Sequence, residues 1–272
     1  MNHQLLKGKR GIIFGALDER SLAWKTAERA FEEGAQFVLT NAPVALRLGT
    51  INQLADKCKA KVIPADATLI EDIEKLYDES IQFLGGKIDF LLHSIGMSPN
   101  VRKGKTYNDL DYNFFLKTLD ISGLSLHKIL QVAEKKDVFN EGASVVALTY
   151  VAAQRVFPHY SDMSQAKALL ESIARSYGYQ LGVKKKVRIN TVSQSPTVTT
   201  AGSGVTGFDT FYSYADKMSP LGNASALDCA DYLITLFSDL TRKVTMQNLF
   251  NDGGFSSMGI SQQILEIVKQ KN

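Results

Sequence analysis

The sequence contains few cysteines, few prolines and little net charge. Its 272 residues include 2 Cys and 6 Pro, and 31 basic against 28 acidic residues leave a formal charge of +3. Two cysteines cannot build the disulfide framework of a small secreted protein, and no Cys/His cluster indicates a metal site. So small a charge excess does not favour a nucleic-acid partner or an anionic membrane surface. We expect a protein of a reducing compartment, the cytoplasm.

Long apolar runs and linkers are also absent. Nowhere do about 18 uninterrupted apolar residues occur, and Met1 to Arg10 lack the apolar core of an export signal. No Pro/Gly/Ser-rich linker, charge block or internal repeat divides the chain. We therefore expect one domain over residues 1–272, with no membrane insertion.

Short apolar runs alternate with segments of helical periodicity along the whole chain. Strands of a parallel sheet are covered on both faces, so they are continuously apolar, as these runs are. The alternation predicts an α/β fold with a doubly wound parallel sheet, the Rossmann fold. The expected strands are Gly11–Phe14, Gln36–Thr40, Lys61–Pro64, Ile88–His93, Ser144–Leu148 and Val187–Val192, with a short one near Gln247–Asn251. The expected helices begin near Ser21 and cover Leu48–Lys59, Leu69–Phe83, Asn113–Glu134, Tyr160–Leu181 and Ala226–Phe237.

One segment lacks a periodic pattern. Residues 197–220 are rich in Thr, Gly and Ser around a few aromatic residues, among them Phe208. Long connections of this kind often cover an active site. We expect 197–220 to be a small mobile lid over the substrate.

The loop after the first strand is a candidate phosphate-binding loop. It lacks the common G-x-G-x-x-G spacing, but Gly15 precedes the start of a helix near Ser21. A helix N-terminus suits a pyrophosphate, although an ordinary turn explains a single glycine equally well. NAD-dependent enzymes usually carry an acid after the second strand, where it accepts a hydrogen bond from the ribose 2′-hydroxyl, but this chain has Ala42 there. Arg47, a few residues later, faces either a 2′-phosphate or solvent. The residues alone leave NADH and NADPH open, and Asp66 is either an adenine partner or a helix N-cap.

Two tyrosines and a lysine are the candidate catalytic residues. Tyr150 ends the fifth strand, and Tyr160 is expected to open the next helix. Lys167 follows Tyr160 by about two helical turns, which predicts that both side chains share one face. A phenol can donate to a carbonyl oxygen that gains negative charge, and a nearby ammonium favours ionisation of the phenol. In a chain with 10 Tyr such a pair also arises by chance.

These residues, with Gly15, Ser21 and the run His93–Gly96, closely resemble the enoyl-acyl-carrier-protein reductases of bacterial fatty acid synthesis. That family is the FabI type within the short-chain dehydrogenase/reductase superfamily. The resemblance extends from Gly8 to Phe255. Two features are specific to the enoyl reductases. Ser164 stands where the superfamily's Tyr-x-x-x-Lys motif has its lysine, and Ala147 replaces the usual catalytic serine.

The resemblance implies an activity and a set of functional residues. The enzyme reduces the trans-2,3 double bond of an enoyl thioester on acyl carrier protein, with NADH as hydride donor, and is a homotetramer. Tyr160 bonds the thioester oxygen, Tyr150 assists, and Lys167 holds the nicotinamide ribose. The implied cofactor residues are Gly15, Ser21, Leu22, Ala42, Asp66, Ala67, Ser94, Ile95, Gly96, Lys167, Thr197, Val198, Thr199, Thr200 and Ala201. The implied substrate residues are Ser98, Tyr150, Tyr160, Met163 and Phe208.

Several residues depart from the family pattern. Lys25 and Ser195 replace glycines and Ala42 replaces a glutamine; we expect Lys25 to point to solvent. The acidic carrier needs a basic surface, which we assign to Lys103 and Lys105.

Two other functions remain open from the residues. One is a carbonyl reductase or alcohol dehydrogenase of the same superfamily, which Ala147 and the long Tyr/Lys spacing disfavour. The other is a nucleotide-binding module without catalysis, which the intact tyrosines and lysine disfavour.

Overall fold

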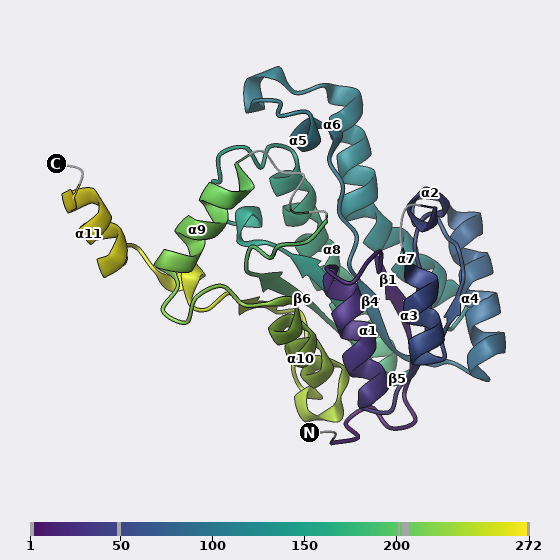
Figure 1. Ribbon diagram of the computed structural model, residues 1–272. Helices are drawn as coiled ribbons and strands as arrows, with labels where there is room; N and C mark the ends of the chain where they lie inside the picture. The colour runs from purple at the N-terminus through teal and green to yellow at the C-terminus, as the bar shows by residue number, and fades with distance from the viewer. Residues whose placement is uncertain (1–2, 48–49, 201, 203–206, 271–272) are drawn as a thin grey trace.

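The apolar runs form one parallel sheet with helices on both faces (Figure 1). The computed structural model describes residues 3–47, 50–200, 202 and 207–270. The strand order is β3-β2-β1-β4-β5-β6-β7, and every neighbouring pair is parallel. The predicted doubly wound α/β fold is therefore confirmed. The strands are β1 Arg10–Phe14, β2 Gln36–Thr40, β3 Lys61–Val62, β4 Ile88–His93, β5 Phe139–Thr149, β6 Arg188–Gln194 and β7 Asn248–Asn251.

Two hydrophobic cores lie on the two faces of the sheet. Successive strand residues point to opposite faces, so Ile12 and Phe14 pack under α4, α7 and α8, whereas Ile13 packs under α1, α3 and α10. The α-helices are α1 Leu22–Glu32, α2 Pro43–Leu46, α3 Ile51–Cys58, α4 Ile70–Leu84, α5 Pro99–Arg102, α6 Tyr112–Leu119, α7 Ser125–Lys135, α8 Met163–Lys185, α9 Phe208–Met218, α10 Ala226–Phe237 and α11 Gln262–Gln270. Short 3-10 turns are η1 Tyr107–Asp109, η3 Val151–Ala153, η5 Asp239–Thr241 and η6 Phe255–Ser257.

The structure corrects several expected boundaries. The single helix expected over Asn113–Glu134 is α6 and α7 joined by a π-helical turn, η2 Asp120–Leu124. Residues 197–220, expected to lack regular structure, contain α9, whose half-buried aromatics pack at helical spacing. The helix expected over Leu48–Lys59 begins at Ile51, and Leu48 lies outside the described residues. Lys25, expected in solvent, is half-buried and paired with Glu28 at 2.9 Å.

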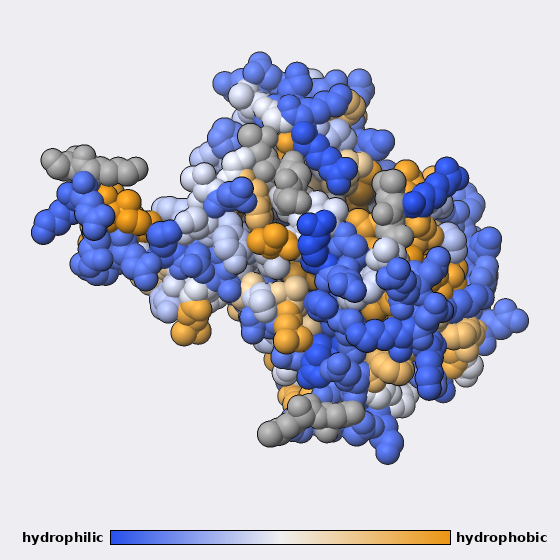
Figure 2. Space-filling view, viewed as in Figure 1, coloured by the Kyte–Doolittle hydropathy of each residue, from blue (hydrophilic) through white to orange (hydrophobic). Residues whose placement is uncertain are grey.

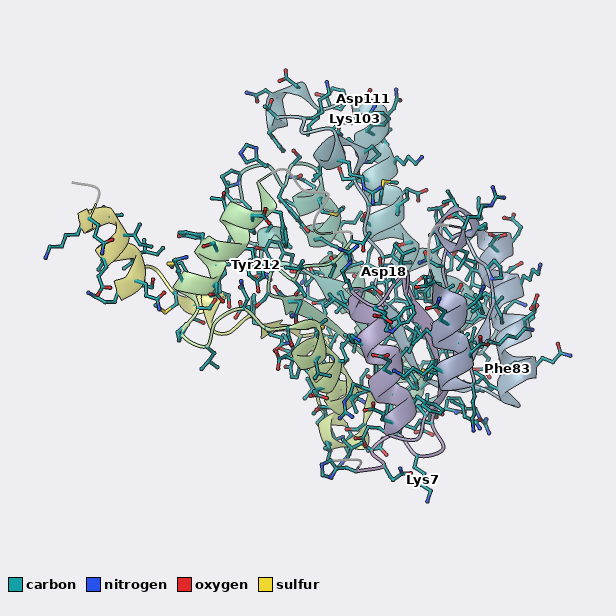
Figure 3. The ribbon with its side chains drawn as sticks, in the orientation of Figure 1. Lys7, Asp18, Phe83, Lys103, Asp111 and Tyr212 are labelled. Atoms are coloured by element: carbon teal, nitrogen blue, oxygen red, sulfur yellow. The ribbon has the colours of Figure 1, made fainter. Side chains whose placement is uncertain are left out.

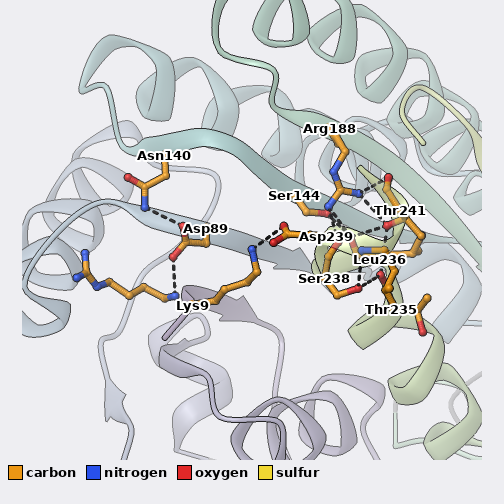
Figure 4. A network of polar contacts seen from close by, with 12 residues as sticks. Lys9, Asp89, Asn140, Ser144, Arg188, Thr235, Leu236, Ser238, Asp239 and Thr241 are labelled. Carbon is orange, nitrogen blue, oxygen red and sulfur yellow. Dashed lines mark hydrogen bonds and ion pairs between the residues drawn. The ribbon is translucent and has the colours of Figure 1, made fainter. Parts of the chain in front are cut away.

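A buried arginine closes the amino-terminal edge of the sheet. The Arg188 guanidinium donates to the carbonyl oxygens of Leu236 (2.9 Å), Ser238 (3.1 Å) and Thr241 (3.1 Å) (Figure 4). These carbonyls lie at and beyond the last turn of α10, where a helix has no donors of its own left. Lys9 and Asp239 form an ion pair beside them at 2.8 Å. Internal contacts thus occupy this edge of the sheet.

The C-terminal helix α11 projects from the body of the molecule (Figure 1). None of its residues is buried, and its apolar side chains Leu265 and Val268 are about half exposed. In Figure 2 this projecting helix shows an orange patch among hydrophilic residues. In the part of the chain that the structure describes, no helix is both long enough and apolar enough to cross a lipid bilayer.

Candidate active site

The loops that follow β1 and β4 meet at the centre of the sheet. In a doubly wound sheet the ligand crevice lies there, outside the carboxyl ends of the strands. Gly15 has φ +94°, and a Cβ at this position would lie 2.0 Å from the carbonyl oxygen of Ser94. Because that neighbour is backbone, a side chain at Gly15 cannot be accommodated by a rotamer change. Glycine is required for the two loops to approach each other.

The first turn of α1 faces this crevice without a side-chain cap. Ser21 is the N-cap, but its hydroxyl donates to the carbonyl oxygen of Asp18 (2.7 Å) and accepts from the Leu17 amide (3.3 Å). The Ser21 side chain therefore accepts no hydrogen bond from the N–H groups of the first helical turn. Such groups, with the helix dipole, bind phosphate.

Asp66, predicted to contact the adenine, lies four residues after the end of β3. Its carboxylate accepts from the Thr68 amide (2.9 Å) and hydroxyl (2.7 Å), so it stabilises a turn. The N-cap of α4 is Leu69, which removes the N-cap alternative. The adjacent Ala67 is buried, whereas Arg47 is exposed at the end of α2.

The segment after β6 reaches back to the loop that follows β1. The Thr200 hydroxyl donates to the Asp18 carboxylate, and the Thr199 hydroxyl accepts from the Gly202 amide at 2.9 Å. Thr197 donates to the carbonyl oxygen of Ser195 at 3.0 Å, and Val198 is exposed. Ala201, predicted to contact the cofactor, lies outside the described residues.

Lys167 lies beneath the crevice on α8. Its ammonium donates to the carbonyl oxygens of Ile95 (3.0 Å), two residues after β4, and of Leu148 (2.9 Å), in the last part of β5. The side chain is 7% exposed, and burial lowers the pKa of Lys167 to about 8, with Glu171 acting in the opposite direction. An ammonium has three donors, so one remains for a ligand hydroxyl.

Tyr160 does not lie where the sequence predicted. It precedes α8, which begins at Met163, so the inference that Tyr160 and Lys167 share one helix face was wrong. Ser161 has φ +43°, which a right-handed helix excludes, and His159 on the other side has φ +66°. Tyr160 therefore projects from a tight turn. Burial raises the pKa of the Tyr160 phenol, so it stays protonated at neutral pH.

Tyr150 stands beside Tyr160 in an aromatic cluster. The two ring centroids are 5.3 Å apart, and Phe157 (5.3 Å) and Phe211 (6.1 Å) also contact Tyr150. Within the described residues the buried Tyr150 hydroxyl has no hydrogen-bond partner. Burial, the nearby Tyr160 and Asp252 all raise the pKa of Tyr150. A buried hydroxyl without a partner fits a site that a ligand oxygen completes.

A cavity of about 740 Å³ opens in front of this cluster. Tyr160, Phe157 and Phe211 form part of its wall, together with residues of η6 and the segment that follows. Met163 and Phe208, expected to line the acyl pocket, are not among its lining residues. Sequence analysis missed the wall that the C-terminal segment supplies. Among the wall residues that sequence analysis did not predict are Val151 and Phe157 after β5, Met218 at the end of α9, and Phe255 and Met258 in the C-terminal segment.

Ser98, another predicted substrate residue, is buried as the N-cap of α5. Its hydroxyl donates to Asp162 (2.6 Å) and accepts from the Val101 amide (3.0 Å). The side chain is thus engaged inside the protein.

Together these groups can hold a dinucleotide and a carbonyl compound. The close loops at Gly15 and Ser94 and the uncapped α1 fit phosphates, and the free donor of Lys167 fits a ribose hydroxyl. Two neutral phenols beside a cavity fit an oxygen that gains negative charge during reaction.

Comparisons with known proteins agree with this chemistry. A family model described as enoyl-(acyl carrier protein) reductase matches residues 15–256. The chain is 32% identical to the NADH enoyl-acyl-carrier-protein reductase 1 of Rhizobium meliloti, covering 94% of this chain and 93% of the relative. It is 34% identical to the FabI of Rickettsia bellii, covering 95% and 98%. A crystal structure of the FabI–NADH complex from Alistipes finegoldii is 66% identical, with a TM-score of 0.95 and coverage of 96% and 92%. The chain belongs to the enoyl-(acyl carrier protein) reductase family.

Proposed function

We propose that this chain reduces the trans-2,3 double bond of enoyl thioesters carried on acyl carrier protein, in the elongation cycle of fatty acid synthesis, with NADH as reductant. The relatives named above carry this activity in their names, and the family model spans the site. The observation that carries the proposal is the pair of phenols at the 740 Å³ cavity: Tyr150 is buried, Tyr160 is half-buried, and their ring centroids are 5.3 Å apart.

NADH, when bound, supplies a hydride, which the family chemistry delivers to the β-carbon of the substrate. The thioester oxygen then gains the negative charge of an enolate, and a proton that comes ultimately from solvent is added to the α-carbon to give the saturated thioester. Tyr160 donates its hydroxyl proton to a hydrogen bond with this oxygen, and Tyr150 orients the substrate or assists. Because burial keeps both phenols protonated, they act as donors at neutral pH. Removing one such donor typically costs about a hundredfold in rate.

Lys167 holds the ribose next to the nicotinamide. Two of its donors are fixed by the carbonyl oxygens of Ile95 and Leu148, which aims the third donor. A charged donor of fixed direction orients a hydroxyl more strictly than a free surface lysine does.

The remaining cofactor contacts follow the loops of the crevice. Gly15, Ser21 and Leu22 approach the pyrophosphate, and Asp66 with Ala67 the adenine. Ala42 lies near the adenosine ribose. Because its methyl group can bind neither a 2′-hydroxyl nor a 2′-phosphate, other contacts must select between NADH and NADPH. The proposed contacts to the rest of the cofactor are Ser94, Ile95, Gly96, Thr197, Val198, Thr199, Thr200 and Ala201.

The segment 197–220, with α9, acts as the lid in this proposal. Its aromatic residues Phe211 and Tyr214 form part of the cavity wall, so a displacement of α9 changes access to Tyr160. Residues 1–272 then form one catalytic domain of which this lid is a part.

The acidic carrier protein docks at a basic surface beside α5. Lys103 and Lys105 are exposed, and the Lys103 ammonium lies 4.3 Å from the centre of the Phe114 ring. Figure 3 places Lys103 and Asp111 at the outer end of the α5–α6 region, and Figure 2 shows that region as hydrophilic. Lys184 and Lys185 are less suited, since they pair with Glu134 and Asp137.

The assembly is a homotetramer in this proposal, as the family resemblance implies. The exposed apolar side of α11 supports an interface with another copy. The proposal places the enzyme in the cytoplasm, which suits its two free, buried cysteines. Light scattering that gives a single-chain mass would contradict the tetramer.

The activity is tested with crotonyl-acyl carrier protein and with a ketone substrate in parallel, each with NADH and NADPH. The proposal expects loss of the reduced-nicotinamide absorbance and formation of butyryl-carrier, with the ketone left unchanged. Reduction of the ketone alone would instead support a carbonyl reductase. NADH binding without any turnover would support a nucleotide-binding module.

A further inference from the structure

A buried carboxylate lies two residues after Tyr160. Asp162 is fully buried and accepts hydrogen bonds from Ser98 Oγ (2.6 Å), Asn100 Nδ2 (2.8 Å) and Thr118 Oγ1 (2.8 Å). We call these four residues the Asp162 cluster. All three donors are neutral side chains, and they come from α5, its N-cap and α6. The cluster therefore joins the start of α8 to two elements that are distant in sequence.

The Asp162 side chain does not cap α8, although its position predicts that it would. Asp162 is the N-cap residue of α8, where an aspartate ordinarily accepts from the amides of the first helical turn. Its side chain makes no such cap bond. The negative charge still lies at the positive end of the α8 dipole, which favours it. The carboxylate serves instead to fix this end of α8 against α5 and α6.

The turn that carries Tyr160 needs such an anchor. His159 and Ser161 both have positive φ, a conformation that is unfavourable for residues other than glycine. On the C-terminal side, Ser161 Oγ donates to the Lys105 carbonyl oxygen at 3.0 Å, and Asp162 follows immediately. On the N-terminal side the Tyr160 amide makes only a long bond, 3.4 Å, to the Phe157 carbonyl oxygen. The side-chain hydrogen bonds that fix this turn thus lie after Tyr160 in the chain, at Ser161 and Asp162.

We propose that Asp162 is a positioning residue, which acts through Tyr160 by holding its turn at the cavity wall. This inference rests on the proposed role of Tyr160. Asn100 extends the same cluster outward, because its side chain also donates to the carbonyl oxygen of Asp111 and accepts from its amide, both at 3.1 Å. These hydrogen bonds therefore link the turn that carries Tyr160 to the N-cap of α6.

Three variants separate positioning from a general loss of structure. Asp162→Ala removes the shared acceptor of Ser98, Asn100 and Thr118, and with it the anchor. Asp162→Asn can keep all three contacts, with its carbonyl oxygen accepting from Asn100 and Thr118 and its amide donating to Ser98. Glu33→Gln is the matched control, since Glu33 is also a fully buried acid but binds the amides of His3 and Leu5, at the opposite end of α1 from the phosphate-binding turn.

The expected results follow from misplacement of a catalytic donor. A displacement of about 1 Å can lower the rate about a hundredfold. Asp162→Ala lowers kcat with crotonyl-carrier by about tenfold, while the Kd for NADH stays within about twofold. Asp162→Asn restores kcat to within about threefold of the parent, and Glu33→Gln leaves kcat unchanged.

The deciding measurement repeats these variants in a Tyr160→Phe background. If Asp162 acts through Tyr160, Asp162→Ala lowers kcat there by less than about twofold. An equal loss in both backgrounds, or no loss in the parent, overturns the positioning role. Full activity of Tyr160→Phe alone refutes instead the role of Tyr160, and the inference fails with it. If Asp162→Ala does not fold, Thr118→Val replaces it in the same double-mutant cycle with Tyr160→Phe. Thr118→Val should lower kcat about threefold when Tyr160 is present and leave kcat unchanged in the Tyr160→Phe background.

Discussion

The buried Lys167 gives the binding of NADH a specific pH dependence. Its pKa is lowered to about 8 by burial, so raising the pH removes its charge in an accessible range. The proposed ribose contact needs the ammonium form. We predict that the affinity for NADH falls as the pH rises through 8.

The magnitude follows from the protonated fraction. With a pKa of about 8, about 90% of Lys167 is protonated at about pH 7 and about 10% at about pH 9. The Kd for NADH should therefore increase about tenfold over this range, which corresponds to about 1.4 kcal/mol.

The stability of the cofactor-free protein should change in the opposite direction. The pKa of Lys167 is lower in the folded state than its ordinary value of 10.5, so between about pH 8 and 10.5 the unfolded state binds more protons. The free energy of unfolding therefore rises with pH across this window, by at most about 3 kcal/mol.

Both trends are measured on the same protein. NADH fluorescence titrations give the Kd, and urea unfolding of the cofactor-free enzyme gives the stability. The Lys167→Met variant should bind NADH more weakly. Its Kd for NADH should no longer rise between about pH 7 and 9, and its free energy of unfolding should no longer rise between about pH 8 and 10.5. A wild-type Kd that does not change between about pH 7 and 9, or an equal slope in Lys167→Met, would refute the reasoning.

Three further changes have separate expected outcomes. Tyr160→Phe should lower kcat about a hundredfold with the NADH Kd within about twofold, measured by steady-state kinetics and fluorescence; near-normal turnover would rule out its role as donor to the enolate. Gly15→Ala places a Cβ 2.0 Å from the Ser94 carbonyl oxygen, so calorimetry should detect no NADH binding, and wild-type affinity would show that the loops can separate. Replacing Lys103 and Lys105 by Glu should raise the KM for carrier-linked crotonyl but not for crotonyl-coenzyme A, and an unchanged KM would move the docking surface elsewhere.

The sheet was predictable from the sequence because its strands are buried on both faces. The run at β4 and the run at β2 were predicted at their observed limits. The polar start of β5 was missed, because Asn140 and Glu141 interrupt the apolar pattern while still extending the strand. Short β3 was predicted too long, since its pairing with β2 covers only two residues.

The candidate site was predictable in composition but not in geometry. Gly15 was predicted as the glycine of a phosphate-binding loop, and the spacing of Tyr160 and Lys167 pointed to the family. The close approach of Gly15 to Ser94 was not predicted. A helical register through Tyr160 could not reveal that Ser161 adopts a left-handed conformation, because this depends on the distant Lys105 carbonyl and on Asp162.

The aromatic wall of the cavity was also beyond sequence reasoning. Phe157, Phe211 and Phe255 come from three separate segments, and their meeting point depends on how α9 and the C-terminal chain pack. α11 was not expected either, although its apolar residues recur at helical spacing.

The transfer of hydride to the β-carbon is tested most directly by isotope labelling. The enzyme is incubated with crotonyl-acyl carrier protein and NADH that carries deuterium at both C4 positions, and the product is analysed by mass spectrometry and NMR. The account predicts butyryl-carrier with a single deuterium at carbon 3. Consumption of the labelled cofactor with deuterium at the carbonyl carbon, or with an unlabelled product, would contradict it.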